Sequence, residues 1–248
     1  MNSPVRPVLL AVALGGTGVF TGIWTVLWAL RGSYLTALIM LAVTIWAIGF
    51  AVFCLCTALG AVTPRAHSDP NGILLRPGVV LDLAAIASTA AITLAAALYL
   101  IFSRLGMVDY VPSAVPRAAL PAACIGLMIF GVPALYQMAR QKCGHHLRLD
   151  PAGFEVWNGH WNSLRRGSWD DVEQILDHPP KGGKPFNKLV VFLPSTGSAA
   201  RLYADAVAED GDALRDWVRF YWKNPEHRAE LVDDRALRRL EQRQFTTG

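Results

Sequence analysis

The chain has 248 residues, of which 53% are hydrophobic and 17% charged, and its mean hydropathy is +0.32. Soluble domains carry about 25% charged residues, so this composition excludes a single soluble core, intrinsic disorder and a disulfide-rich secreted domain. Charge is unevenly divided, because residues 1–143 hold 8 Lys/Arg and 3 Asp/Glu whereas residues 144–248 hold 15 and 16. The net charge of +4 and the pI near 9.0 therefore come from the apolar half and do not indicate nucleic-acid binding.

Four long apolar segments lie in the first half, at 8–30, 34–61, 79–102 and 118–137. The first would span roughly 34 Å as a helix, against a hydrocarbon core of about 30 Å. Backbone polar groups find no water in a bilayer, so such segments must be helical. The sequence predicts a four-helix transmembrane domain over residues 1–143.

A cleaved signal peptide is the alternative for the first segment. Its apolar run is longer than the usual run of about 7–15 residues, and Trp24 and Trp28 near its far end are typical of interfacial anchors. We therefore expect a retained helix.

The basic residues of the short loops predict the orientation, since Lys and Arg are enriched on the cytoplasmic side. With the N-terminus inside, the inner segments hold Arg6, Arg65, Arg76, Arg140, Lys142 and Arg148, and the outer loops hold Arg31, Arg104 and Arg117. This bias predicts a multi-pass protein of the plasma membrane with both termini in the cytoplasm.

The connection between the second and third helices, residues 63–78, contains a turn sequence at 68–72 (Ser-Asp-Pro-Asn-Gly). Glycine there supplies a positive φ. The segment that follows, Ile73–Arg76, is either a short strand or an interfacial segment.

Asp82 is the one ionisable side chain predicted within a membrane segment, and an intramembrane acid is a candidate for function. It lies in the first turn of the third helix, where an acid also complements the positive end of the helix dipole. The other predicted helices contain no carboxylate, Lys or His, which argues against a coupled transporter.

The cysteines match no redox or zinc pattern. Three of the four lie in the predicted membrane segments, where buried apolar cysteine is the simplest interpretation. Cys143, His145 and His146 follow the fourth helix and are either a juxtamembrane polar cluster or contacts for a metal. We predict no metal site, no cofactor and no catalytic residue.

From His145 onward, apolar residues recur with period two around a turn at Asp150–Gly153. A buried strand is predicted at 189–193, and an amphipathic helix at about 210–223. Residues 144–224 are therefore predicted to form a cytoplasmic α+β domain. It would be a small antiparallel sheet or partly open barrel capped by a C-terminal helix.

This pattern, over about residues 145–231, resembles the bacterial pleckstrin-homology-like (PH-like) domain of actinobacterial multi-pass membrane proteins. The resemblance is carried by a D-x-x-G turn and a W-x-D-V-x-x-I segment, which here are Asp150, Gly153, Trp169, Asp171, Val172 and Ile175. It implies a PH-like fold and a binding or scaffolding module without chemistry of its own.

Related eukaryotic domains often bind phosphoinositides through a basic loop between the first two strands. That loop here is Pro151-Ala152 and carries no positive charge, so we do not expect it to bind lipid headgroups. Lys181, Lys184 and Lys188 form a different basic set, which either contacts anionic lipid or a partner or belongs to a solvated loop.

The last segment, residues 225–248, is predicted to be a polar helical tail. It either docks on its own domain or binds a partner or the membrane surface.

These features predict a non-enzymatic scaffold or accessory subunit of a cell-envelope complex, whose cytoplasmic domain recruits protein partners. The alternative is a small transporter or channel-like protein regulated by that domain, with a pore supplied by oligomerisation. The lipid bilayer is a partner in either case, and nucleic acid is not.

Overall fold

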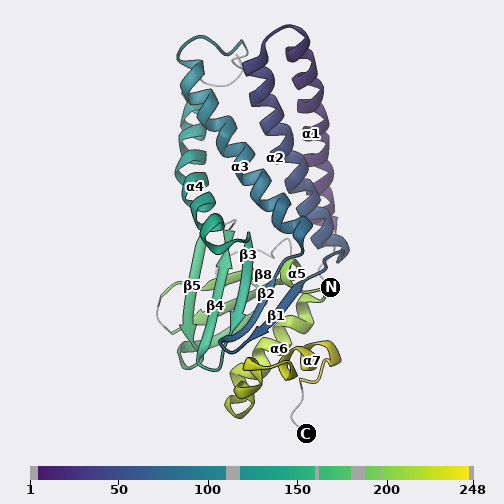
Figure 1. Ribbon diagram of the computed structural model, residues 1–248, viewed down its shortest axis with the longest axis vertical. Helices are drawn as coiled ribbons and strands as arrows, with labels where there is room; N and C mark the ends of the chain where they lie inside the picture. The colour runs from purple at the N-terminus through teal and green to yellow at the C-terminus, as the bar shows by residue number, and fades with distance from the viewer. Residues whose placement is uncertain (1–4, 110–117, 160–161, 180–187, 196, 246–248) are drawn as a thin grey trace. The chain divides into compact units, whose positions relative to one another are not determined.

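The structure is a computed structural model, and it describes residues 5–109, 118–159, 162–179, 188–195 and 197–245. The chain divides into two compact units (Figure 1). The helical unit comprises Val8–Leu55 and Leu83–Lys142, and the sheet unit comprises Met1–Pro7, Cys56–Asp82 and Cys143–Gly248.

Four long helices supply the helical unit: α1 (Val5–Leu30), α2 (Tyr34–Leu59), α3 (Val79–Ser103) and α4 (Ala119–Gln141). All four are long and apolar enough to cross a membrane, which confirms the four predicted helices. Large apolar side chains such as Val12 and Phe130 are exposed, at 67% and 72%. A lipid-facing surface accounts for this exposure, because lipid tails are as apolar as the side chains.

Small residues allow close approach between the helices of this unit. A Cβ at Gly49 on α2 would overlap Ser88 Oγ on α3, and one at Gly131 on α4 would overlap Thr93 on α3. Between α1 and α2, the hydroxyls of Thr21 and Thr44 are hydrogen-bonded at 2.9 Å. Such contacts are the usual source of helix association in lipid.

Among the residues that the structure describes, eight antiparallel strands form two sheets in the sheet unit (Figure 1). One sheet has the order β1 (Arg65–Asp69), β2 (Gly72–Arg76), β3 (His145–Leu149), β4 (Gly153–Asn158) and β5 (Ser163–Ser168). The other has the order β6 (Val172–Leu176), β7 (Leu189–Pro194) and β8 (Ala200–Tyr203).

The connection between α2 and α3 is a β-hairpin that belongs to this sheet unit. Gly72 has φ +124° beside the turn, and Ile73–Arg76 is part of a strand, which confirms the strand interpretation of this segment. Ile73 and Leu75 of β2 lie opposite Leu149 and Leu147 of β3 and are almost fully buried. The predicted domain at 144–224 thus lacks a hairpin that the compact unit contains.

The two sequence motifs of the sheet unit contact each other. Asp150 Oδ1 accepts hydrogen bonds from the backbone N–H groups of Ala152 and Gly153, both at 2.8 Å, which closes the β3–β4 turn. The indole of Trp169 is buried and donates to the carbonyl of Asp150 at 2.8 Å. Trp169 begins a short 3-10 turn, Trp169–Asp171, that leads into β6.

Helices complete the core of the sheet unit. A short helix α5 (Ala204–Val207) precedes α6 (Gly211–Lys223), and Asp210 caps α6 by accepting from the N–H of Asp212 at 3.0 Å. Leu214, Trp217 and Tyr221 of α6 are fully buried, as the amphipathic pattern predicted.

The C-terminal tail docks on its own unit, which confirms the first of its two interpretations. It forms a 3-10 helix η3 (Pro225–Val232) and then α7 (Arg235–Gln242). Leu231 and Ala236 are fully buried in the core, and Trp217 Nε1 donates to the carbonyl of Ala236 at 2.9 Å.

Candidate functional site

Asp82 lies in the first turn of α3, as predicted, and its side chain is buried. Its carboxylate forms a hydrogen-bonded ion pair with the guanidinium of Arg65 on β1. Its other oxygen accepts from the backbone N–H of Gly144 at 2.9 Å, just before β3. Arg65 Nε also donates to the carbonyl of Pro77 at 2.9 Å.

These contacts make Asp82 a junction between three segments of the sheet unit that are far apart in sequence. Both carboxylate oxygens are engaged by donors, an arrangement suited to holding β1 and the start of β3 and not to releasing and rebinding a cation. Sequence reasoning singled out Asp82 but missed Arg65 and Gly144. The hairpin turn at 68–72 was the available signal, since it returns Arg65 towards the start of α3.

A second polar chain starts at Cys143. Cys143 Sγ lies 3.5 Å from His146 Nδ1, and His146 Nε2 lies 2.8 Å from Glu155 Oε1 on β4. The second oxygen of Glu155 accepts from Arg166 on β5. The indole of Trp157 donates to the carbonyl of Cys143 at 3.1 Å. Thiol, imidazole and carboxylate thus occur in the order of a nucleophile, a base and an orienting acid.

The electrostatics of this chain oppose catalysis. Burial raises the pKa of Cys143 to about 11, and the side chain has no exposed surface. Burial also lowers the pKa of His146, against the opposing effect of Glu155. Burial alone would raise the pKa of Glu155, but hydrogen bonds from His146 and Arg166 lower it overall.

The consistent protonation state is a neutral thiol that donates to Nδ1 and an Nε2–H that donates to an ionised Glu155. A buried, protonated thiol has neither the charge nor the access that a nucleophile needs. The arrangement satisfies buried polar groups and ties β3 to β4 and β5.

His145 does not join Cys143 and His146 in one site. Its Nδ1 accepts from the backbone N–H of Gly159 at 3.2 Å, and its ring packs edge-on against Tyr203. In the part of the chain that the structure describes, no group of three or more His, Cys, Asp or Glu side chains is placed to hold a metal ion.

The predicted lysine set is only partly within the described residues. Lys181 and Lys184 lie outside them. Lys188 is described, and its ammonium is 2.7 Å from Asp212 and 3.5 Å from Asp210. Lys188 is thereby drawn into an ion-pair cluster at the start of α6.

The helical unit contains an apolar cavity of about 290 Å³ between α2, α3 and α4. Thr36 and Tyr99 are the lining residues with a hydroxyl, and among the described residues no Asp, Glu, Lys, Arg or His lines it. Such a lining offers few polar groups to replace the hydration of an ion.

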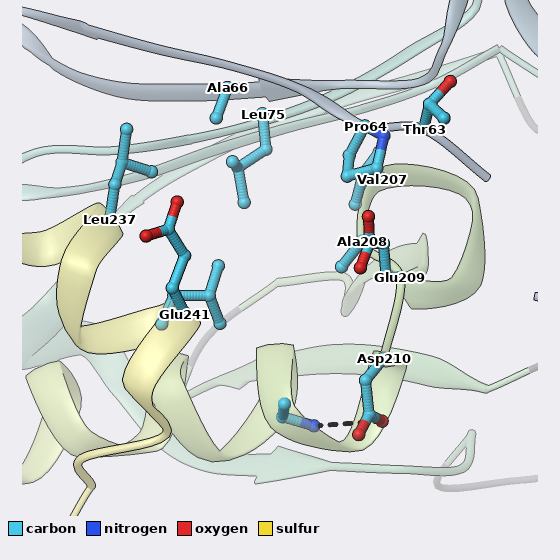
Figure 2. Close-up of a pocket in the computed structure, with 12 residues that line it drawn as sticks. Thr63, Pro64, Ala66, Leu75, Val207, Ala208, Glu209, Asp210, Leu237 and Glu241 are labelled. Atoms are coloured by element: carbon cyan, nitrogen blue, oxygen red, sulfur yellow. Dashed lines mark hydrogen bonds between the residues drawn. The ribbon is translucent and has the colours of Figure 1, made fainter.

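The sheet unit contains a groove of about 350 Å³ between the β1–β2 hairpin, the α5–α6 connection and α7 (Figure 2). We call it the α7 groove. Its apolar lining is Pro64, Ala66, Leu75, Val207, Ala208, Ala213, Leu237 and Leu240, and its acidic residues are Glu209, Asp210 and Glu241. No basic side chain lies among the described residues that line it.

Comparison with family models, with curated proteins and with solved structures found no match.

Proposed function

We propose that this chain is a non-enzymatic membrane scaffold, or an accessory subunit of a cell-envelope complex, whose sheet unit is a PH-like binding domain in the cytoplasm. The observation that carries the proposal is the β1–β2 hairpin. A segment between two membrane helices is built into the sheet by the pairing of β2 with β3. The recruiting surface is therefore joined to the membrane helices through three connections, at 60–64, 77–78 and 142–144.

The PH-like assignment is supported by the arrangement of the motifs that suggested it. The turn at Asp150–Gly153 and the buried Trp169 are hydrogen-bonded to each other. Two antiparallel sheets precede α6, whose apolar face is buried in the same core. On this proposal, α3 and α4 are inserted within the sequence of the domain, between β2 and β3.

The contacts of the candidate site support a non-enzymatic role. The thiol–imidazole–carboxylate chain of Cys143, His146 and Glu155 is buried, with the pKa of Cys143 raised to about 11 by burial. The carboxylate of Asp82 is held by Arg65 and Gly144. Both groups are used to join segments of the sheet unit.

In-cell photocrosslinking of the full chain tests the proposal. A photoreactive residue replaces Glu173 or Glu241 on the sheet unit, or Val12 or Phe130 on the helical unit, all four of which are exposed. We expect protein adducts from the two sheet-unit positions and lipid adducts from the two helical positions. Protein adducts confined to Val12 and Phe130 would overturn the proposal, as would protein adducts at none of the four positions.

A further inference from the structure

The α7 groove combines an apolar lining with free negative charge. Leu75, Val207 and Ala208 are buried, while Leu237 and Leu240 of α7 are partly buried against the core. Figure 2 shows Leu237 and Glu241 of α7 on one side and Ala66 and Leu75 of the hairpin on the other. The apolar surface that the groove exposes therefore comes from Leu237 and Leu240 of α7 and from the exposed Ala66 of β1.

The three acidic residues of the groove differ in whether they have hydrogen-bond or ion-pair partners. Asp210 caps α6 and forms an ion pair with Arg243 at 2.9 Å. Glu209 and Glu241 are exposed, and among the described residues neither has a hydrogen-bonding or ion-pair partner. Two unpaired carboxylates beside apolar side chains, without a cation in the lining, attract a ligand that is both apolar and basic.

One end of the groove follows α2 closely in the sequence. Thr63 and Pro64 line one end, and α2 ends at Leu59. Four residues of extended chain reach at most about 14 Å, so Thr63 lies within that distance of the end of a membrane-spanning helix. Proteins in the same bilayer present Lys/Arg-rich segments next to their apolar spans on the cytoplasmic side.

We propose that the α7 groove binds the basic juxtamembrane segment of a partner membrane protein, with apolar side chains against Ala66, Leu237 and Leu240 and flanking Lys or Arg at Glu209 and Glu241. This deepens, and rests on, the proposed scaffold function. The free edge of β1, which pairs only with β2 among the described strands, is available to such an extended segment.

A defined peptide tests the groove directly. The probe is fluorescein-labelled Lys-Lys-Val-Leu-Val-Lys-Lys, added to the full chain in nanodiscs of uncharged phosphatidylcholine and followed by fluorescence anisotropy. Two control peptides separate the contributions: one replaces every Lys with Glu, and one replaces Val-Leu-Val with Ser-Gly-Ser. We expect both controls to bind at least about tenfold more weakly, because the first loses the charge pairs with Glu209 and Glu241 and the second loses the apolar contacts.

Three variants locate the binding. The double variant Glu209→Lys, Glu241→Lys reverses the acidic charge, and Ala66→Phe fills the groove from an exposed position. Glu173→Lys is the control, because Glu173 is also an exposed glutamate, lies on β6 and does not line the groove. We expect the first two to weaken probe binding about tenfold or more and the control to leave it within twofold, with all melting temperatures unchanged.

Equal binding of the acidic peptide, equal loss in the Glu173 control, or no probe binding below about 1 mM would overturn the groove inference. If the photocrosslinks at Glu173 persist in that case, the scaffold proposal stands and its contact surface lies elsewhere. If probe binding follows the predicted pattern but photocrosslinking finds no protein, the groove binds basic apolar peptides and the scaffold proposal fails.

Discussion

The helical and sheet units differ in the size of the side chains that they bury. In the helical unit, large apolar residues such as Phe130 are exposed and small ones such as Gly49 lie between helices. In the sheet unit, large aromatic residues such as Trp157, Trp169 and Trp217 are almost fully buried, and each indole N–H donates to a backbone carbonyl. Large apolar side chains are stable on a surface that faces lipid, whereas water favours their burial. Large apolar residues are therefore exposed in the helical unit and buried in the sheet unit.

The largest effect should come from truncating a buried aromatic residue of the sheet unit. Trp217→Ala leaves a cavity and removes the bond to Ala236, so we expect a loss of about 3–5 kcal/mol in the free energy of unfolding. Phe130→Ala in the helical unit should cost less than about 1 kcal/mol, because lipid fills the vacated space. Temperature-dependent proteolysis of the full chain in nanodiscs measures both. Equal effects would mean that Phe130 packs against protein.

Within the helical unit, adding a methyl group between helices should be more harmful than adding one on the lipid side. Gly49→Ala would overlap Ser88, and we expect a loss of about 1–3 kcal/mol. Gly15→Ala meets no atom within 4 Å and should be neutral or stabilising by up to about 1 kcal/mol. Melting of the two variants in the same detergent provides the comparison. A loss at Gly15 as large as that at Gly49 would contradict the assigned α2–α3 contact.

The smallest effect is a pH dependence confined to the sheet unit. Burial lowers the pKa of His146 below its usual 6.5, so the unfolded chain binds more protons than the folded one as the pH falls below 6.5. Stability should therefore decrease on acidification, by at most about 1.4 kcal/mol per pH unit. Glu155, whose pKa is also lowered, adds to this loss only below its usual 4.5.

Proteolysis of the full chain between pH 7 and pH 5 measures this dependence, with His146→Gln as the comparison. The variant should flatten the curve for the sheet unit and leave the helical unit unchanged. An equal pH slope in the variant would show that another group carries the proton uptake.

Local patterns predicted much of the sheet unit. The Asp150–Gly153 turn, the buried strand β7 and the helix α6 all occur where short-range signals placed them. The pairing of β2 with β3 did not follow from the sequence, because it joins residues on either side of α3 and α4, and β1 is polar (Arg-Ala-His-Ser-Asp) without an apolar alternation. The division of the helical tail into η3 and α7, with Leu231 and Ala236 buried in the core, also did not follow from the sequence.

The candidate site was less predictable than the fold. Asp82 stood out because ionisable residues are rare in apolar helices, yet its partners come from β1 and Gly144. The sequence pattern grouped Cys143 with His146 but not with Glu155. Only the β3–β4 register, which places His146 opposite Trp157, brings Glu155 within hydrogen-bonding distance of His146. The α7 groove left no local signal, because its lining residues come from three segments of the chain.

The sequence by itself determined the membrane helices, since a bilayer requires about 20 consecutive apolar residues and leaves no alternative to a helix. It also determined the turns, because Gly and Asp select local backbone conformations whatever the surroundings. The tertiary structure alone decided which segments share a sheet, which partners hold Asp82 and His146, and where apolar surface stays open beside α7. Those outcomes depend on contacts between residues far apart in the chain, whose free energy no local pattern encodes.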